Sequence, residues 1–214
     1  MQNFDKILYI NLDFCKDRNE HMLKQFEHLS IKKKQIQRIS ATHTPINGHR
    51  GCALSHIKAL ETAIDKGWKN VLILEDDCDF FLPVKYINPF IDYFFSQVND
   101  QWDIFLLGGN VGKKEPSHWN HIYRVLESTN AHAYAVNRHY MPILLENFKE
   151  AYTLLLEDAF PILSKKTPID KHWKTLQKKD RWLMGEIIIA AQKPFASNIT
   201  KKAYYQDGKF SYLL

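Results

Sequence analysis

An apolar run that ends on three consecutive acids is the part of this chain best suited to chemistry. The run 71–74 leads directly into Glu75, Asp76 and Asp77. Neighbouring carboxylates repel one another unless a positive charge lies among them. Carboxylate oxygens are ligands that suit Mg²⁺ or Mn²⁺. The run therefore predicts either a divalent-cation site or a solvated acidic turn, and this segment alone leaves both open.

The surrounding elements predict an α/β sheet that would position these acids. Apolar runs without alternation, at 7–10, 71–74 and 102–107, are typical of strands buried on both faces. The segment 55–66 has helical apolar spacing, ends at Gly67 and precedes the 71–74 run, as in a βαβ unit. In open sheets of this kind ligands bind beyond the carboxyl ends of the strands, which is where the acids stand.

Apolar spacing and turn residues predict the other elements. Helices are expected over 17–29, 88–98 and 138–148, a short helix from 168, strands over 35–39, 131–136 and 195–199, and polar loops over 42–50 and 111–119. The 214 residues fit a single domain, 1–214, in which 201–214 form a basic, tyrosine-rich tail.

The composition excludes several classes of protein. Hydrophobic residues make up 45% of the chain and charged residues 25%, as in an ordinary globular protein. No apolar run is long enough to cross a bilayer, and the start of the chain lacks the pattern of a signal peptide. Cys15, Cys52 and Cys78 have no metal-like spacing, which indicates reduced thiols and a cytoplasmic location.

The net charge of +5 comes with dispersed lysine clusters. These clusters either form a solvated surface or attract anionic headgroups or a phosphate-rich ligand, so peripheral association with a membrane stays open. Because the lysines do not gather into one basic arm, no nucleic-acid partner is expected.

Seven short segments match one pattern between residues 6 and 199. They are 9–13 with Asp17 and Arg18, Gly-Cys-Ala-Leu-Ser-His at 51–56, Leu-Ile-Leu-Glu-Asp-Asp at 72–77, 102–104, 131–136, 168–170, and 192–194 with Ser197. Together they resemble glycosyltransferase family 25, which includes lipooligosaccharide galactosyltransferases and collagen galactosyltransferase domains. The segments 51–56 and 72–77 are specific as a pair, whereas the others are weak alone.

The resemblance implies a GT-A fold, which is a Rossmann-like, mostly parallel sheet flanked by helices. It also implies an inverting transfer that depends on Mn²⁺ or Mg²⁺. The sugar, often galactose, would move from a UDP-sugar to a hydroxyl of a glycan, glycolipid or lipooligosaccharide acceptor. A metal bridging the diphosphate oxygens would stabilise the leaving group. A collagen acceptor is not expected, because the chain lacks the extra repeats and retention signal of the collagen enzymes.

The resemblance also assigns roles to the acidic segment. Asp77 is expected to bind the metal directly, and Asp79 would join it in a second, overlapping Asp-x-Asp register. Glu75 or Asp76 would hold ribose hydroxyls or a metal-bound water. His172 is either a late metal ligand or a surface histidine.

Further residues take roles from the same resemblance. Asp170 is the candidate base for the acceptor hydroxyl, or only a helix N-cap. Asn11, Asp13 and Arg18 would shape the nucleotide pocket, where Arg18 would either pair with phosphate or form a surface salt bridge.

The segment 51–56 is expected to begin a helix. There, free N–H groups of Gly51, Ser55 and His56 would meet a phosphate or nucleobase. Ser55 is alternatively a helix N-cap, and His56 is alternatively part of a structural hydrogen bond. The pair at 49–50 departs from the family pattern, which leaves the choice of donor or acceptor open.

Two other functions compete with the transferase. A non-catalytic nucleotide-sugar-binding module would keep the fold without turnover, although the three acids favour an enzyme. Phosphoryl or nucleotidyl transfer would need further converging acids or a phosphate-binding loop, and no Gly-x-x-x-x-Gly-Lys motif is present.

Overall fold

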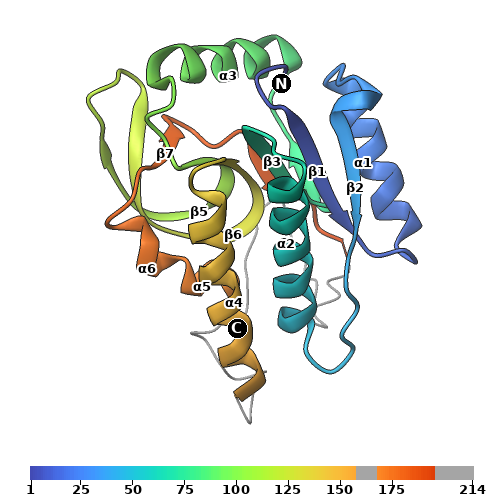
Figure 1. Ribbon diagram of the computed structural model, residues 1–214. Coiled ribbons are helices and arrows are strands. Elements are labelled where there is room, and N and C mark those ends of the chain that lie inside the picture. The colour runs from blue at the N-terminus through green and yellow to red at the C-terminus, as the bar shows by residue number, and fades with distance from the viewer. Residues whose placement is uncertain (158–167, 196–214) are drawn as a thin grey trace.

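A computed structural model describes residues 1–157 and 168–195 (Figure 1). Its elements are β1 (Lys6–Asn11), α1 (Lys16–His28), η1 (Lys33–Gln35), β2 (Ile36–Ser40), α2 (Gly48–Asp65), β3 (Asn70–Glu75), β4 (Cys78–Phe80), α3 (Val84–Val98), β5 (Ile104–Pro116), β6 (Ile122–Asn137), α4 (Met141–Glu157), α5 (Ile169–His172), α6 (Lys174–Gln177), β7 (Trp182–Gly185) and β8 (Ala190–Gln192).

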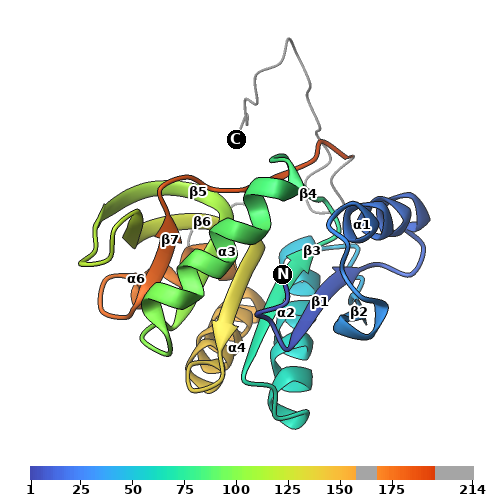
Figure 2. The same cartoon turned by 90° about the horizontal axis from the view of Figure 1, so that it is seen from above.

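Within the described residues, eight strands form one sheet in the order β2-β1-β3-β6-β7-β5-β8-β4, with an additional β5–β6 pairing. The strands β1, β2 and β3 are mutually parallel, and β6 is antiparallel to β3, β5 and β7. It follows that β1, β2, β3, β5, β7 and β8 run in one direction, while β4 and β6 run in the other. Helices flank both faces of the sheet (Figure 2). The predicted α/β class with a mostly parallel, helix-flanked sheet is confirmed.

The central strand β3 is buried on both faces, as its unbroken apolar run predicts. Val71 and Ile73 belong to the core formed with α2 and α4, whereas Leu72 and Leu74 belong to the core formed with α1 and α3. Alternate side chains of a strand point to opposite faces, so a run of four apolar residues serves both layers.

The helix expected over 55–66 begins earlier, at Gly48. Asn47 caps it, because its side-chain oxygen accepts a 3.1 Å hydrogen bond from the backbone N–H of His49. Residues 48–50 of the predicted loop 42–50 therefore belong to the helix instead. Gly67 follows the helix with a φ of +66°, a left-handed conformation that suits its predicted role at the helix end.

The loop expected over 111–119 is wrong. The strand β5 continues to Pro116 and pairs with β6 in a long hairpin whose register shifts several times. The polar residues that suggested a loop are tolerated because the ribbon is exposed and cross-strand pairs such as Arg124 with Glu115, at 2.9 Å, lie on it.

Other boundaries also differ from the predictions. The helix α3 begins at Val84 rather than 88, and α4 runs from Met141 to Glu157. Phe195 is not in a strand, and the rest of the predicted strand 195–199, like the tail 201–214, lies outside the described residues. No helix in the described ranges is both long enough and apolar enough to span a membrane. All three cysteines lie in those ranges, and none forms a disulfide.

Candidate functional site

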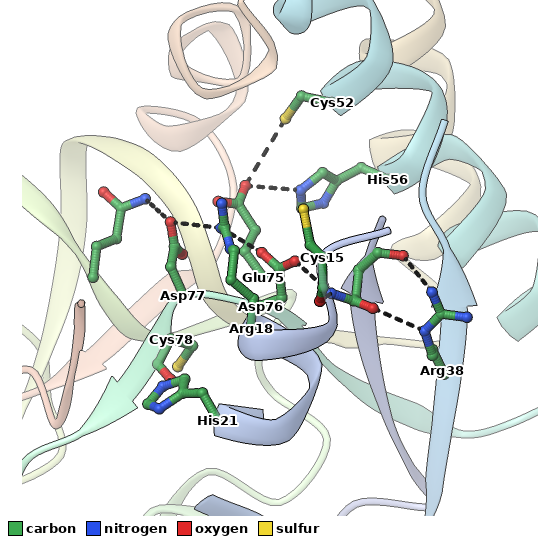
Figure 3. A network of polar contacts seen from close by, with 12 residues as sticks. Cys15, Arg18, His21, Arg38, Cys52, His56, Glu75, Asp76, Asp77 and Cys78 are labelled. Carbon is green, nitrogen blue, oxygen red and sulfur yellow. Dashed lines mark hydrogen bonds and ion pairs between the residues drawn. The ribbon is translucent and has the colours of Figure 1, made fainter. Parts of the chain in front are cut away.

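The three acids after β3 take different partners in the structure. Glu75 is the last residue of β3. Its side chain lies on the same face of the sheet as those of Val71 and Ile73, which faces α2. Asp76 therefore turns to the opposite side, toward α1, because successive side chains of a strand alternate. Figure 3 shows Cys52 and His56 on one side of Glu75, and Arg18 beside Asp76 and Asp77.

Arg18 supplies the positive charge that the acidic run requires. Its guanidinium forms an ion pair with Asp76 and lies 3.1 Å from Asp77 Oδ2. Asn11 Nδ2 also donates a 2.7 Å hydrogen bond to Asp76. Only 11% of the Arg18 side chain is exposed, so the predicted surface salt bridge is in fact a buried one. Burial raises the pKa of Asp76, and Arg18 and Asn11 oppose that rise.

Asp77 is the acid whose polar atoms are least satisfied. Its Oδ2 contacts Arg18 and lies 3.5 Å from Gln192 Nε2, but its buried Oδ1 has no hydrogen-bond partner among the described residues. Burial, and then the negative charge of Glu75, raise the pKa of Asp77 to about 7. A buried oxygen without a partner is costly, so this atom favours a bound cation or a proton.

Arg18→Ala is expected to lower the free energy of unfolding by about 3–5 kcal/mol at pH 8, because it leaves two buried carboxylates without their cation. The loss should shrink below about pH 7, where Asp77 takes up a proton. Urea unfolding at both pH values measures the change. The control is Lys24→Ala, which removes an exposed ion pair with Glu20. Equal effects of the two variants at pH 8 would show that the buried pair contributes nothing special.

A cavity of about 250 Å³ lies beside the acids, at the carboxyl ends of β1 and β2. It is lined by Tyr9, Asn11, Asp13, Lys16, Asn19 and Arg38. Asn11 joins the cavity to the acidic cluster, because its amide donates to Asp76 while its oxygen accepts a 3.0 Å hydrogen bond from Arg38 Nε. Two residues expected at a nucleotide pocket, Asn11 and Asp13, thus line one cavity, whereas Arg18 lies among the acids.

Arg38 is a residue that the sequence analysis missed. Its Nη2 lies 2.6 Å from Asp13 Oδ1, and the hydrogen bonds from Arg38 and Ser40 lower the pKa of Asp13. The parallel pairing of β1 with β2 sets Tyr9 beside Arg38, near the carboxyl ends of both strands. The sequence signal that could have identified Arg38 is an arginine within the predicted strand 35–39.

Asp170 is connected to Asp77 through two amide side chains. Its Oδ2 accepts a 3.0 Å hydrogen bond from the backbone N–H of Asn130, whose Nδ2 donates to Gln192 Oε1 at 2.9 Å. Gln192 in turn contacts Asp77. Pro168 occupies the N-cap position of α5, so the N-cap alternative for Asp170 is wrong. Neither Asn130 nor Gln192 was predicted as a site residue, and Gln192 lies on β8, a strand that was not predicted.

Gly51 and Ser55 have packing roles within α2. A Cβ on Gly51 would lie 2.4 Å from Thr42 O, so only glycine lets the helix approach that loop. The Ser55 hydroxyl donates to Gly51 O at 2.6 Å and accepts from the Thr42 N–H at 2.9 Å. Because α2 begins at Gly48, the N–H groups of Ser55 and His56 are not at a helix start, and Ser55 is not an N-cap. The helix-start argument is therefore wrong for these two residues, and the contact of the segment 51–56 with a phosphate or nucleobase stays a prediction.

Gly51→Ala is expected to lower the free energy of unfolding by about 1–3 kcal/mol, because the added methyl group overlaps backbone that cannot easily shift. Denaturant unfolding measures the change. The matched control is Gly112→Ala, where a Cβ would meet nothing closer than 3.8 Å. A Gly51 variant as stable as the Gly112 variant would contradict the packing.

His56 is fully buried in a hydrogen-bonded row. Its Nδ1 lies 2.9 Å from Tyr134 Oη, and its Nε2 lies 3.1 Å from Glu75 Oε1. Cys52 Sγ lies 3.9 Å from the same Glu75 oxygen. Burial alone would raise the pKa of Glu75, but its contact with His56, together with the nearby His132 and Arg18, outweighs burial and lowers that pKa. The structural hydrogen bond, one of the two alternatives for His56, is present.

Asp79 and His172 have partners on other elements. Asp79 Oδ1 accepts a 2.7 Å hydrogen bond from Gln25 in α1, so that oxygen is already engaged. His172 Nε2 lies 3.2 Å from Glu150 Oε2 in α4, and both line a different cavity of about 670 Å³. The structure thus pairs His172 with α4 rather than with the acids after β3.

No protein-family model matches the chain, and no curated protein matches it. Several solved structures share parts of its chain path, including the following three. Mannose-1-phosphate geranyltransferase from Thermus thermophilus is 12% identical, with a TM-score of 0.47 and coverage of 84% of this chain and 72% of that one. UDP-glucose pyrophosphorylase complexed with UDP-glucose is 8% identical, with a TM-score of 0.46 and coverage of 86% and 90%.

The third is a glycosyltransferase involved in the glycosylation of the major capsid of PBCV-1. It is 12% identical, with a TM-score of 0.43 and coverage of 84% of this chain and 93% of that one.

Proposed function

We propose that this protein is a metal-dependent, inverting glycosyltransferase that moves a sugar from a UDP-sugar to a hydroxyl of a glycan or lipooligosaccharide. Galactose is the first donor sugar to test. The observation that supports the proposal most is the buried, unpartnered Oδ1 of Asp77 at the carboxyl end of the central strand. Through its other oxygen Asp77 contacts Arg18, which pairs with Asp76, and Asp76 accepts a hydrogen bond from Asn11 in the lining of the cavity.

A divalent cation fits Asp77 on two grounds. The Oδ1 atom needs a partner, and a carboxylate oxygen is a ligand that Mn²⁺ and Mg²⁺ accept. Such a cation would neutralise charge on a leaving diphosphate. Arg18 holds Asp76 and the Oδ2 of Asp77 in place. This contact fixes the carboxylate group of Asp77 and therefore the direction of its other oxygen, Oδ1.

The cavity beside β1 and β2 is the proposed site for the nucleoside part of the donor. Tyr9 offers an aromatic ring, while Asn11, Asp13 and Asn19 offer hydrogen-bonding groups. Lys16 and Arg38 add positive charge to the same lining, which suits a ligand that carries phosphates.

Asp170 is the proposed general base. An inverting transfer needs a group that accepts the proton of the acceptor hydroxyl. The Asn130 N–H holds one oxygen of Asp170, and the Asn130–Gln192 contact connects this residue to the proposed metal ligand Asp77. The base and the leaving-group side of the reaction would therefore be positioned by one continuous network.

Titration of the purified protein with UDP, UDP-galactose and UDP-glucose, with Mn²⁺ and then with a chelator, tests the function. Metal-dependent binding followed by donor hydrolysis is the expected result. Metal-dependent binding without turnover, even with glycan and glycolipid acceptor mixtures, would favour the non-catalytic binding module. Absence of any binding would overturn both proposals.

A further inference from the structure

A second group of metal-ligating side chains lies on the other face of β3. Cys52 and His56 stand four residues apart on α2 and therefore share one face of that helix, directed at Glu75. The Cys Sγ, a His ring nitrogen and a Glu oxygen all lie within 4.8 Å of one another. Asp77, the proposed donor-metal ligand, is not in this group.

The ligand types of this group differ from those around Asp77. A thiolate, an imidazole and a carboxylate are the ligands of zinc and related borderline cations, whereas Mg²⁺ and Mn²⁺ prefer oxygen alone. The elements that carry them, α2 and β3, are rigid parts of the core, so little reorganisation is required.

Charge balance also favours a dication at this place. A dication bound to one thiolate, one carboxylate and a neutral imidazole gives a site with no net charge. Such a site avoids the cost of burying an uncompensated charge.

The surroundings supply the outer contacts that a metal-binding histidine needs. The Nδ1 of His56 contacts the hydroxyl of Tyr134, which can either donate or accept a hydrogen bond. If Nε2 binds a cation, Nδ1 carries the ring proton and donates a hydrogen bond to the Tyr134 hydroxyl oxygen. Tyr134 thus allows the tautomer of His56 that a ligand role requires.

His132 provides an independent sign that this pocket lacks a polar partner. It precedes Ala133, which pairs with Leu74, so it lies next to Glu75 across the sheet. Its side chain is buried, with the residue 3% exposed, and its Nδ1 has no hydrogen-bond partner among the described residues. The charge of Glu75 acts on this ring, which places both in one electrostatic environment.

We propose that Cys52 Sγ, His56 Nε2 and Glu75 Oε1 bind a zinc-class divalent cation, with a water or a neighbouring side chain as the fourth ligand. Binding breaks the S–H bond of Cys52, and that proton is released to solvent as the metal–sulfur bond forms. The cation takes the place of the Nε2 proton that His56 directs at Glu75, and the neutral ring then carries its one proton on Nδ1. The site does not depend on the proposed sugar transfer.

Cobalt(II) titration of the chelator-treated, full-length protein tests the site, because a thiolate ligand gives cobalt an intense near-ultraviolet charge-transfer band. One equivalent of cobalt is expected to produce this band, and zinc should displace the cobalt. Cys52→Ala and His56→Ala should lose the band. Tyr134→Phe should weaken zinc binding by about 10–100-fold, because it removes the outer contact of His56.

Cys78→Ala is the matched control, since Cys78 is another buried cysteine but belongs to the core on the α1 and α3 side. It should keep the band. Absence of the band in the unmodified protein would overturn the proposal, and so would a band that persists in Cys52→Ala. The first of these results is obtained with the unmodified protein. It can therefore overturn the proposal even if a variant fails to fold. Asp77→Asn should keep the band whether or not the proposed sugar transfer is correct.

Discussion

Asp77→Asn is expected to abolish Mn²⁺-dependent UDP binding and, at the same time, to stabilise the metal-free protein at pH 8. The amide keeps the size of the side chain and removes the charge that burial and Glu75 disfavour. Isothermal titration with Mn²⁺ and UDP measures the first effect, and urea unfolding measures the second. A residue with a purely structural role would not lose ligand binding and gain stability together.

The sign of the stability effect follows from the direction of the pKa shift. The folded protein raises the pKa of Asp77 from 3.8 to about 7, so it binds this proton more tightly than the unfolded chain does. The stabilisation from that proton is complete below about pH 4 and is lost as the pH rises through 7. Asp77→Asn should remove this loss and raise the free energy of unfolding at pH 8 by up to about 4 kcal/mol.

Donor binding should have the opposite pH dependence. A cation binds the carboxylate and not the carboxylic acid, so Mn²⁺-dependent UDP binding should strengthen as the pH rises through about 7. Asp79→Asn is the matched control, because Asp79 is a nearby acid already held by Gln25. It should retain most of the binding. Unchanged binding in Asp77→Asn would move the metal site elsewhere, and equal losses in both variants would place the metal between the two acids.

Asp170→Asn is expected to lower the rate of sugar transfer by about 10²–10⁴-fold, because the amide cannot accept the acceptor proton. UDP binding in the presence of Mn²⁺ should stay unchanged. The asparagine oxygen can still accept the hydrogen bond from the Asn130 N–H, so the fold around α5 should persist. Transfer assays with saturating donor, together with direct measurement of UDP affinity, separate the two effects.

Glu150→Gln serves as the control for this substitution. Glu150 contacts α5 from α4 through His172, away from the acids after β3. Its transfer rate should match that of the unmodified protein. A near-normal rate in Asp170→Asn would assign the base to another residue, while a loss of UDP affinity would indicate that Asp170 acts on the donor instead.

Local patterns in the sequence were sufficient for the central architecture. The unbroken run 71–74 predicted a strand buried on both faces, and Val71 and Leu72 indeed face different cores. The helical apolar spacing over 55–66, together with Gly67 after it, predicted the helix α2. These signals are local, because backbone periodicity fixes which side chains share a face. The part of the β5–β6 hairpin that falls in 111–119 was missed because its residues are mostly polar and exposed. Such a segment shows no apolar alternation that would predict a strand.

The sequence by itself determined that three acids stand at the carboxyl end of the central strand, since strand length and apolar character fix where the strand ends. Only the tertiary structure decided which partner each of these acids takes. Strand alternation sends Glu75 to His56 on α2 and Asp76 to Arg18 on α1, while Gln192 from β8 approaches Asp77. Those partners are far apart along the chain, and only the packing of helices and strands around one sheet brings their charges within contact distance.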